Sequence, residues 1–199
     1  MRQATYDEFV DLSRRGTFVP VVKGIIGDLL APVSAFLKIA EHSDYAFLFE
    51  SVEGGEQVAR YSFLGKDPFL VLKARNGKTI VDRSGVTSES DEPFMEATRR
   101  LMAEFRSPYV PGLPRFTGGA VGVIAYDASP SFEPVLNQAW SQAQWARDPR
   151  NEDDAGFMLF DTVLAFDHVK HRILIIANAR ITADENLEAL YQFACAKIQ

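Results

Sequence analysis

Short runs of apolar residues separated by polar turns dominate the chain, a pattern typical of β-strands. Glu53-Gly54-Gly55-Glu56 and Asn76-Gly77 lie between neighbouring runs and predict two hairpin turns, because glycine adopts positive φ without strain. A third hairpin is predicted with its turn at 167–171. The runs that predict strands are 18–26, 45–51, 58–64, 69–74, 79–81, 116–126, 157–166 and 172–181.

Four segments instead repeat their apolar residues at helical spacing. The first follows a capping box, Thr5-x-x-Glu8, and the second begins at Pro32, which suits a first helical position. The third spans 93–105, and the last is predicted to begin at a second capping box, Thr182-x-x-Glu185. Residues 83–92 are rich in Ser, Asp and Glu without periodicity and predict a surface loop. Residues 129–154 fit neither pattern.

Hairpins and meanders interrupted by helices, without regular βαβ alternation, predict the α+β class, with antiparallel sheets built from hairpins and helices packed outside. The length of 199 residues allows one large domain or at most two small ones. We predict a single domain over 1–199.

Composition narrows the possible partners and the compartment. The chain is 47% hydrophobic and carries a net charge of −6, which disfavours nucleic acid and anionic membranes as partners. Its apolar runs, such as 173–177, are too short to cross a bilayer, and the N-terminus lacks the apolar core of a signal peptide. Cys195 has no partner for an internal disulfide and is expected to be a small core residue in a reducing cytosol. These features predict a cytoplasmic protein.

Two motifs with possible chemistry fit structural roles better. His168-x-x-His171 lies at a predicted hairpin turn, and no Glu, Cys or second cluster completes a metal shell around it. Gly118-Gly119-x-x-Gly122 matches neither dinucleotide nor Walker spacing, so we interpret it as a strand with close backbone approach or a bulge. No set of nucleophile, general base or paired carboxylates stands out, so we predict no catalytic residue and no metal ligand.

One hairpin gathers complementary charges. Glu50 and Ser51 end its first strand, while Arg60 and Ser62 begin its second, so antiparallel pairing brings a carboxylate, hydroxyls and a guanidinium together beside aromatic residues. Such a patch suits a zwitterion, with Glu50 binding an ammonium and Arg60 a carboxylate. An ordinary cross-strand ion pair on the surface is the alternative.

The same residues carry a family resemblance. Glu-Ser-Val-Glu-Gly-Gly at 50–55 and Arg-Tyr-Ser-Phe-Leu-Gly at 60–65 resemble the N-terminal part of anthranilate synthase component I. Three more segments resemble that family in the same order, at 31–36, 111–122 and 161–180. The chain departs from the family pattern at Val123-Ile124 and at 129–131. The resemblance nevertheless spans essentially the whole chain.

The resemblance implies a role in making anthranilate and pyruvate from chorismate and ammonia. It implies that the chorismate-binding C-terminal half, absent here, also binds Mg²⁺, and that a glutamine amidotransferase subunit (component II) is a partner. The chain itself would then be a regulatory and scaffolding domain that is inactive alone, needs no cofactor of its own, and contributes to feedback inhibition by tryptophan.

The resemblance also assigns roles within the hairpin. Glu50 and Ser51 match the acidic-Ser pair that binds tryptophan, and Arg60 matches the basic residue of the next strand. Two alternatives stay open at this point. One is the corresponding half of aminodeoxychorismate synthase in the folate pathway, and the other is a non-catalytic ligand-binding module.

Overall fold

The computed structural model describes residues 4–27, 30–50, 60–133, 135–136, 152–182 and 185–199. The chain divides into two compact units, which we describe separately. The first unit comprises Met1–Pro68, Met102–Gly119 and Leu159–Gln199, and the second comprises Phe69–Leu101 and Ala120–Met158. The division into two compact units does not test whether they fold as one, so the single domain over 1–199 stays a prediction.

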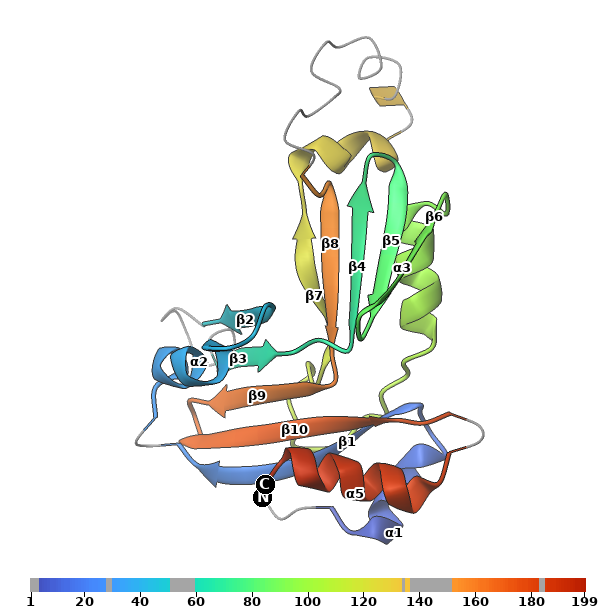
Figure 1. Ribbon diagram of the computed structural model, residues 1–199. Helices are drawn as coiled ribbons and strands as arrows, with labels where there is room; N and C mark the ends of the chain where they lie inside the picture. The colour runs from blue at the N-terminus through green and yellow to red at the C-terminus, as the bar shows by residue number, and fades with distance from the viewer. Residues whose placement is uncertain (1–3, 28–29, 51–59, 134, 137–151, 183–184) are drawn as a thin grey trace. The chain divides into compact units, whose positions relative to one another are not determined.

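The first unit is built on a five-stranded sheet (Figure 1). Its neighbouring strands are all antiparallel, as Val21 opposite Ala177 and Leu48 opposite Leu64 illustrate. The hairpin partners expected on either side of 51–59 and 168–171 are confirmed, and so is the α+β class with antiparallel sheets. The strand order is β1 (Phe18–Ile26), β10 (Arg172–Arg180), β9 (Thr162–Asp167), β3 (Tyr61–Lys66) and β2 (Ala46–Phe49).

Three helices pack on this sheet: α1 (Tyr6–Ser13), α2 (Pro32–Ala40) and α5 (Leu187–Lys197). Helices α1 and α5 join a core with Val21 and Ala177, while α2 packs on Leu64 and Ile173. Ile173 and Ala177 are four residues apart on β10 and therefore point to the same face of the sheet. All three helices thus cover one face, and buried Cys195 belongs to this core as predicted.

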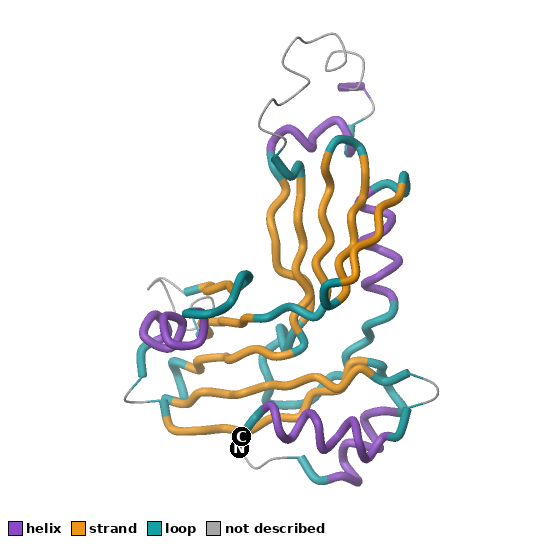
Figure 2. Tube along the Cα trace, in the orientation of Figure 1, coloured by secondary structure: helices purple, strands orange, loops and turns teal. Residues whose placement is uncertain are grey.

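The second unit is another five-stranded sheet, and its strands are among the orange segments in Figure 2. Helix α3 (Phe94–Ala103) packs on it through Phe94, whose ring stacks on Phe157 with centroids 5.4 Å apart. A 3₁₀ helix, Tyr126–Ser131, follows β7. The strand order is β6 (Val86–Ser90), β5 (Lys78–Arg83), β4 (Leu70–Arg75), β8 (Ala155–Phe160) and β7 (Gly119–Ile124).

The loop predicted over 83–92 is wrong, because β6 pairs with β5 there. Ser84 and Gly85 both have positive φ, and Gly85 N–H donates to the Asp82 carboxylate at 2.8 Å, which closes a two-residue hairpin turn. All five residues of β6 are exposed. A strand with no buried face has no hydrophobic alternation, so the pattern gave no signal.

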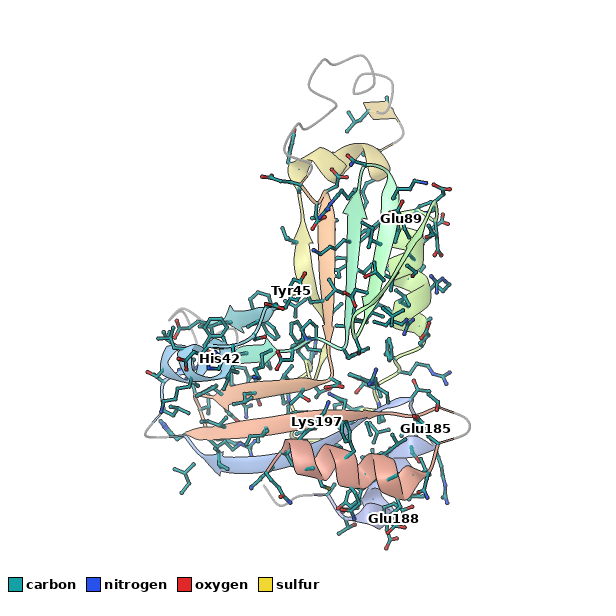
Figure 3. The ribbon with its side chains drawn as sticks, viewed as in Figure 1. His42, Tyr45, Glu89, Glu185, Glu188 and Lys197 are labelled. Atoms are coloured by element: carbon teal, nitrogen blue, oxygen red, sulfur yellow. The ribbon has the colours of Figure 1, made fainter. Side chains whose placement is uncertain are left out.

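The single strand predicted over 157–166 is also wrong. It is divided at Asp161 into β8 of one sheet and β9 of the other. The carbonyl of Asp161 accepts hydrogen bonds from the backbone and the side chain of Asn178, at 2.7 and 3.0 Å. Its buried carboxylate accepts from Thr162 at 2.8 Å and from Lys197 at 2.7 Å, the α5 residue labelled in Figure 3. These partners are distant in sequence, except Thr162, so local patterning could not locate the break.

The helix beginnings were predicted in three of four cases. The capping box of Thr5 and Glu8 is formed, Pro32 is the first residue of α2, and α3 begins within one residue of its predicted start. The start predicted for the last helix is wrong. Thr182 donates to the Glu185 carboxylate at 2.7 Å, but α5 begins only at Leu187, where Asn186 caps its first amides.

Gly118 confirms the structural interpretation of the glycine motif. It has φ +144°, and a Cβ added to it would lie 2.6 Å from Asn178 Nδ2 and 2.9 Å from the carbonyl oxygen of Phe160. Gly122 approaches the backbone still more closely, because a Cβ added to it would overlap the carbonyl oxygen of Gly156. Only glycine allows these approaches without moving the neighbouring strand.

We expect Gly118→Ala to destabilise the protein clearly more than Gly119→Ala. Both residues have positive φ, but a Cβ on Gly119 would meet only Phe116, at 3.9 Å. Gly119→Ala should therefore cost roughly 1–3 kcal/mol of backbone strain, and Gly118→Ala should add about 1–3 kcal/mol of overpacking. Urea unfolding of the two variants measures the difference. Equal midpoints would contradict the close approach.

Candidate ligand-binding site

The predicted site residues lie around one end of the β2–β3 pair. Glu50 is exposed and directly follows β2, while Arg60 directly precedes β3. Ser51 lies outside the described residues. The last paired residues of the two strands are Phe49 and Phe63. Glu50 and Arg60 therefore both lie beyond the last backbone pair of β2 and β3, although the Arg60 carbonyl still accepts a hydrogen bond from the His168 backbone N–H at 3.0 Å.

Arg60 does not pair with Glu50 in this structure; it binds Asp167 of β9. Its Nε and Nη2 donate to the two carboxylate oxygens of Asp167, each at 3.0 Å. This is the fork-to-fork geometry in which a guanidinium and a carboxylate bind most strongly. The Asp167 side chain is fully buried, whereas one third of the Arg60 side chain is exposed. The guanidinium is therefore anchored from inside the protein and still reaches solvent.

Arg172, the first residue of β10, binds the same carboxylate. Its Nε donates to Asp167 Oδ2 at 3.2 Å, and the backbone N–H of Lys170 donates to Oδ1 at 3.3 Å. The strand register explains the convergence, because Asp167 lies opposite Tyr61 on one side and opposite Arg172 on the other. Two guanidinium groups thus share one carboxylate, which leaves this group of three side chains with a net charge of +1.

The pairing shifts the pKa values of the group. Burial alone would raise the pKa of Asp167, but the hydrogen bond and charge of Arg60, with smaller contributions from the Lys170 amide and Arg172, hold that pKa below its ordinary value. The hydrogen bond that Arg60 donates to Asp167 in turn raises the pKa of Arg60. Burial, followed by the Asp167 charge, raises the pKa of Tyr61. Asp167 and Arg60 are therefore both ionised at neutral pH.

Aromatic rings and a second polar pair border these charges. The Arg60 guanidinium carbon lies 4.8 Å from the centre of the Tyr61 ring, and the Tyr61 and Phe63 rings lie 5.8 Å apart. Phe49, opposite Phe63, is 55% exposed. Buried Ser62 is 2.8 Å from Nε2 of His168, so this histidine of the rejected metal motif takes part in a side-chain hydrogen bond. The arrangement offers a cation beside accessible aromatic surface.

Sequence reasoning missed Asp167 and Arg172 as partners of Arg60. The only local signal was the charge of Asp167 at the end of an apolar strand, where it had been interpreted as part of a turn. Its partners lie 107 positions before it and five after it. Pairing across three strands is needed to bring them together.

Two cavities of the first unit are lined by other residues. One, of about 370 Å³, lies between α1, β1 and residues 109–113. The other, of about 320 Å³, lies between Ile39, Leu164, Asp161 and Lys197. Neither is lined by Glu50 or Arg60.

Within the described ranges, no three His, Cys, Asp or Glu side chains are grouped so that they could hold a metal ion. The same ranges contain no helix that is both long and apolar enough to span a membrane.

We expect Asp167→Asn to make the free energy of unfolding depend less on pH in the acid range. The folded-state pKa of Asp167 is lowered, so its stabilisation is complete above the unfolded-state pKa of about 4 and is lost as pH falls through the folded-state pKa. At pH 7 the substitution should cost about 3 kcal/mol, because it leaves two guanidiniums without a buried anion. Below about pH 4 the difference should shrink, and the two proteins should converge once the pH is below the lowered folded-state pKa. Denaturant unfolding from pH 2 to 8 measures both.

Asp153→Asn is the matched control for that experiment. Asp153 also binds two cations, Arg75 at 2.7 Å and Lys73 at 3.2 Å, but its side chain is 27% exposed. Its loss should cost about 1 kcal/mol or less. Equal losses at the two positions would show that burial does not strengthen the Asp167 pairs.

Comparison with known proteins shows what the chain is similar to. No family model matches the chain. The chain is 37% identical to anthranilate synthase component 1 of Acetivibrio thermocellus over 98% of its own length and 38% of the relative. It is 35% identical to the protein of that name from Synechocystis sp., over 97% of the chain and 37% of the relative. The chain thus spans little more than a third of these curated relatives.

Among solved structures, the crystal structure of anthranilate synthase component I from Streptococcus pneumoniae TIGR4 aligns with 86% of this chain and 35% of its own, at 24% identity and a TM-score of 0.49.

The sequence relatives define the class first: the chain is related to the chorismate-utilising enzymes. Within that class it belongs to the anthranilate synthase component I family, and it corresponds to the N-terminal part of those proteins. The resemblance found in the sequence is thereby confirmed.

Proposed function

We propose that this chain is the regulatory and scaffolding part of an anthranilate synthase component I and carries part of a tryptophan feedback site. One observation carries the proposal. In a chain related to component I, a guanidinium is held by two hydrogen bonds to a buried carboxylate beside accessible aromatic rings, in a group of side chains with net positive charge. A carboxylate attached to an aromatic amino acid suits that arrangement.

Each predicted residue has a distinct part in this proposal. Arg60 binds the α-carboxylate of tryptophan, and the exposed carboxylate of Glu50 binds its α-ammonium. Ser51 adds a hydrogen bond to the amino acid. The aromatic residues of β3 and the exposed ring of Phe49 offer surface for the indole. Inhibition then follows by linkage, because tryptophan stabilises the inactive arrangement by the difference between its affinities for the two states.

The chemistry itself belongs, in this proposal, to the part of component I that the chain does not include. That part would bind chorismate and Mg²⁺, and a glutamine amidotransferase subunit would supply ammonia. The described residues here do not fit Mg²⁺, since no three carboxylate, His or Cys side chains are grouped among them. We therefore assign no step of the reaction to a metal in this chain.

Ligand analogues separate the roles of Arg60 and Glu50. In a complete component I that carries this chain, we expect Arg60→Gln to weaken binding of tryptophan and of indole-3-propionate by about tenfold, because both have the carboxylate, and to spare tryptamine, which lacks it. Glu50→Gln should weaken tryptophan and tryptamine and spare indole-3-propionate. Isothermal titration measures all three affinities.

Arg100→Gln is the control for these titrations. Arg100 binds a carboxylate through the same two atoms as Arg60, its Nε and Nη2, but this partner is Glu92. Its loss should leave all three affinities unchanged. The assignment is wrong if Arg60→Gln weakens the three ligands equally, or if tryptophan inhibits the Glu50 and Arg60 variants as strongly as the unsubstituted enzyme.

We expect the 199-residue chain alone to form no anthranilate from chorismate, ammonium and Mg²⁺. The physical reason is that no three His, Cys, Asp or Glu side chains among the described residues are grouped so that they could hold the Mg²⁺ that the reaction would need. Fluorescence of anthranilate is a sensitive readout, and a complete component I assayed in parallel is the positive control. Turnover by the chain alone would mean that catalytic residues lie in this part of the protein.

A further inference from the structure

We propose that Asp167 is the positioning residue of the carboxylate-binding Arg60, and that Arg172 is the second cation that makes this positioning compatible with ligand binding. The proposal rests on the function proposed above and adds two residues to its site. Neither residue was predicted from the sequence to contact a ligand, and both act through Arg60.

The first argument is geometric. A surface arginine has four rotatable side-chain bonds, and holding it in one orientation costs conformational entropy. Two hydrogen bonds of 3.0 Å to both oxygens of Asp167 fix the plane of the Arg60 guanidinium before any ligand arrives. Asp167 is itself fixed, because it is buried in a strand paired on both sides. The orientation of Arg60 is therefore set by the sheet, which is the rigid support that a precise binding site requires.

The second argument concerns charge. If Asp167 bound Arg60 alone, a ligand carboxylate would compete with it for one guanidinium. Any displacement of Arg60 would then leave a buried carboxylate without a cation, which is costly. Arg172, at 3.2 Å, and the Lys170 amide, at 3.3 Å, remain on Asp167 in that case. They allow Arg60 to share its positive charge with a ligand without exposing Asp167 to that cost.

The third argument is the difference in solvent exposure between the two arginines and Asp167. The Arg60 side chain is 33% exposed and the Arg172 side chain is 19% exposed, over a carboxylate that has no exposed surface. An incoming anion therefore meets Arg60 first and does not meet Asp167 directly. The Tyr61 ring beside the guanidinium further restricts its movement. The chemical class that this group of side chains selects is a carboxylate carried on an apolar or aromatic body.

Side-chain NMR of arginine tests the positioning without any ligand. In the 199-residue chain, Arg60 should give a sharp Nε–Hε signal in slow exchange with water, because Hε is hydrogen-bonded to a buried carboxylate. Asp167→Asn should broaden or remove that signal, while Asp153→Asn, which removes the second unit's two-cation carboxylate, should leave it unchanged. An unchanged Arg60 signal in Asp167→Asn would overturn the positioning role.

Binding by complete component I tests the consequence for the ligand. Asp167→Asn should weaken tryptophan about tenfold and leave tryptamine unchanged. A merely structural role would weaken both ligands alike, and that result would overturn the proposal.

A second pair of variants covers the case in which Asp167→Asn does not fold. Arg172→Lys keeps the charge and should bind tryptophan within about twofold of the unsubstituted protein, whereas Arg172→Gln removes it and should bind at least about threefold more weakly. Equal affinities of the two variants would overturn the role of Arg172. If the unsubstituted protein binds no tryptophan while Arg60 is rigid by NMR, the proposed function fails and the positioning of Arg60 stands.

Discussion

Asp167 is a buried carboxylate that is stable only because cations from two other places in the chain reach it. Arg60 precedes β3 and Arg172 begins β10, so the requirement to compensate one charge ties together three adjacent strands at one end of their sheet. Removing either the anion or the cations leaves an unpaired charge in a poorly solvated place, which costs several times more than losing a surface ion pair. The strand register at this end therefore has an electrostatic as well as a hydrophobic origin.

Asp161, at the opposite end of β9, is also a buried carboxylate with hydrogen-bond partners from distant parts of the chain. Its carboxylate is buried and accepts hydrogen bonds from Lys197 and Thr162, and its carbonyl accepts two from Asn178. A short strand bounded by two satisfied aspartates has little freedom to slip, because a shift of one residue would bury both charges without partners. One end of the strand serves as an anchor for α5, and the other supports the candidate ligand site. The same physical device thus has a structural role at one end and, in our proposal, a functional role at the other.

The sequence predicted features with local causes and missed those with distant ones. The Thr5–Glu8 capping box, Pro32 at a helix start and the turn at Asn76-Gly77 each act within a few residues, and all three were predicted correctly. Strand β6 was not predicted because it buries no side chain. The break at Asp161 was not predicted because the main hydrogen-bond partners of Asp161 are 17 and 36 positions away. In the candidate site, the charged hairpin was visible in the sequence, but the partner of Arg60 was not.

A structure of complete component I with tryptophan bound would test the central claim most directly, namely that an internally anchored guanidinium recognises the carboxylate of a feedback ligand. The account predicts a tryptophan carboxylate oxygen within hydrogen-bonding distance of the Arg60 guanidinium, while Arg60 and Arg172 still contact Asp167. Tryptophan bound away from Arg60, or bound to an Arg60 that has left Asp167, would contradict it.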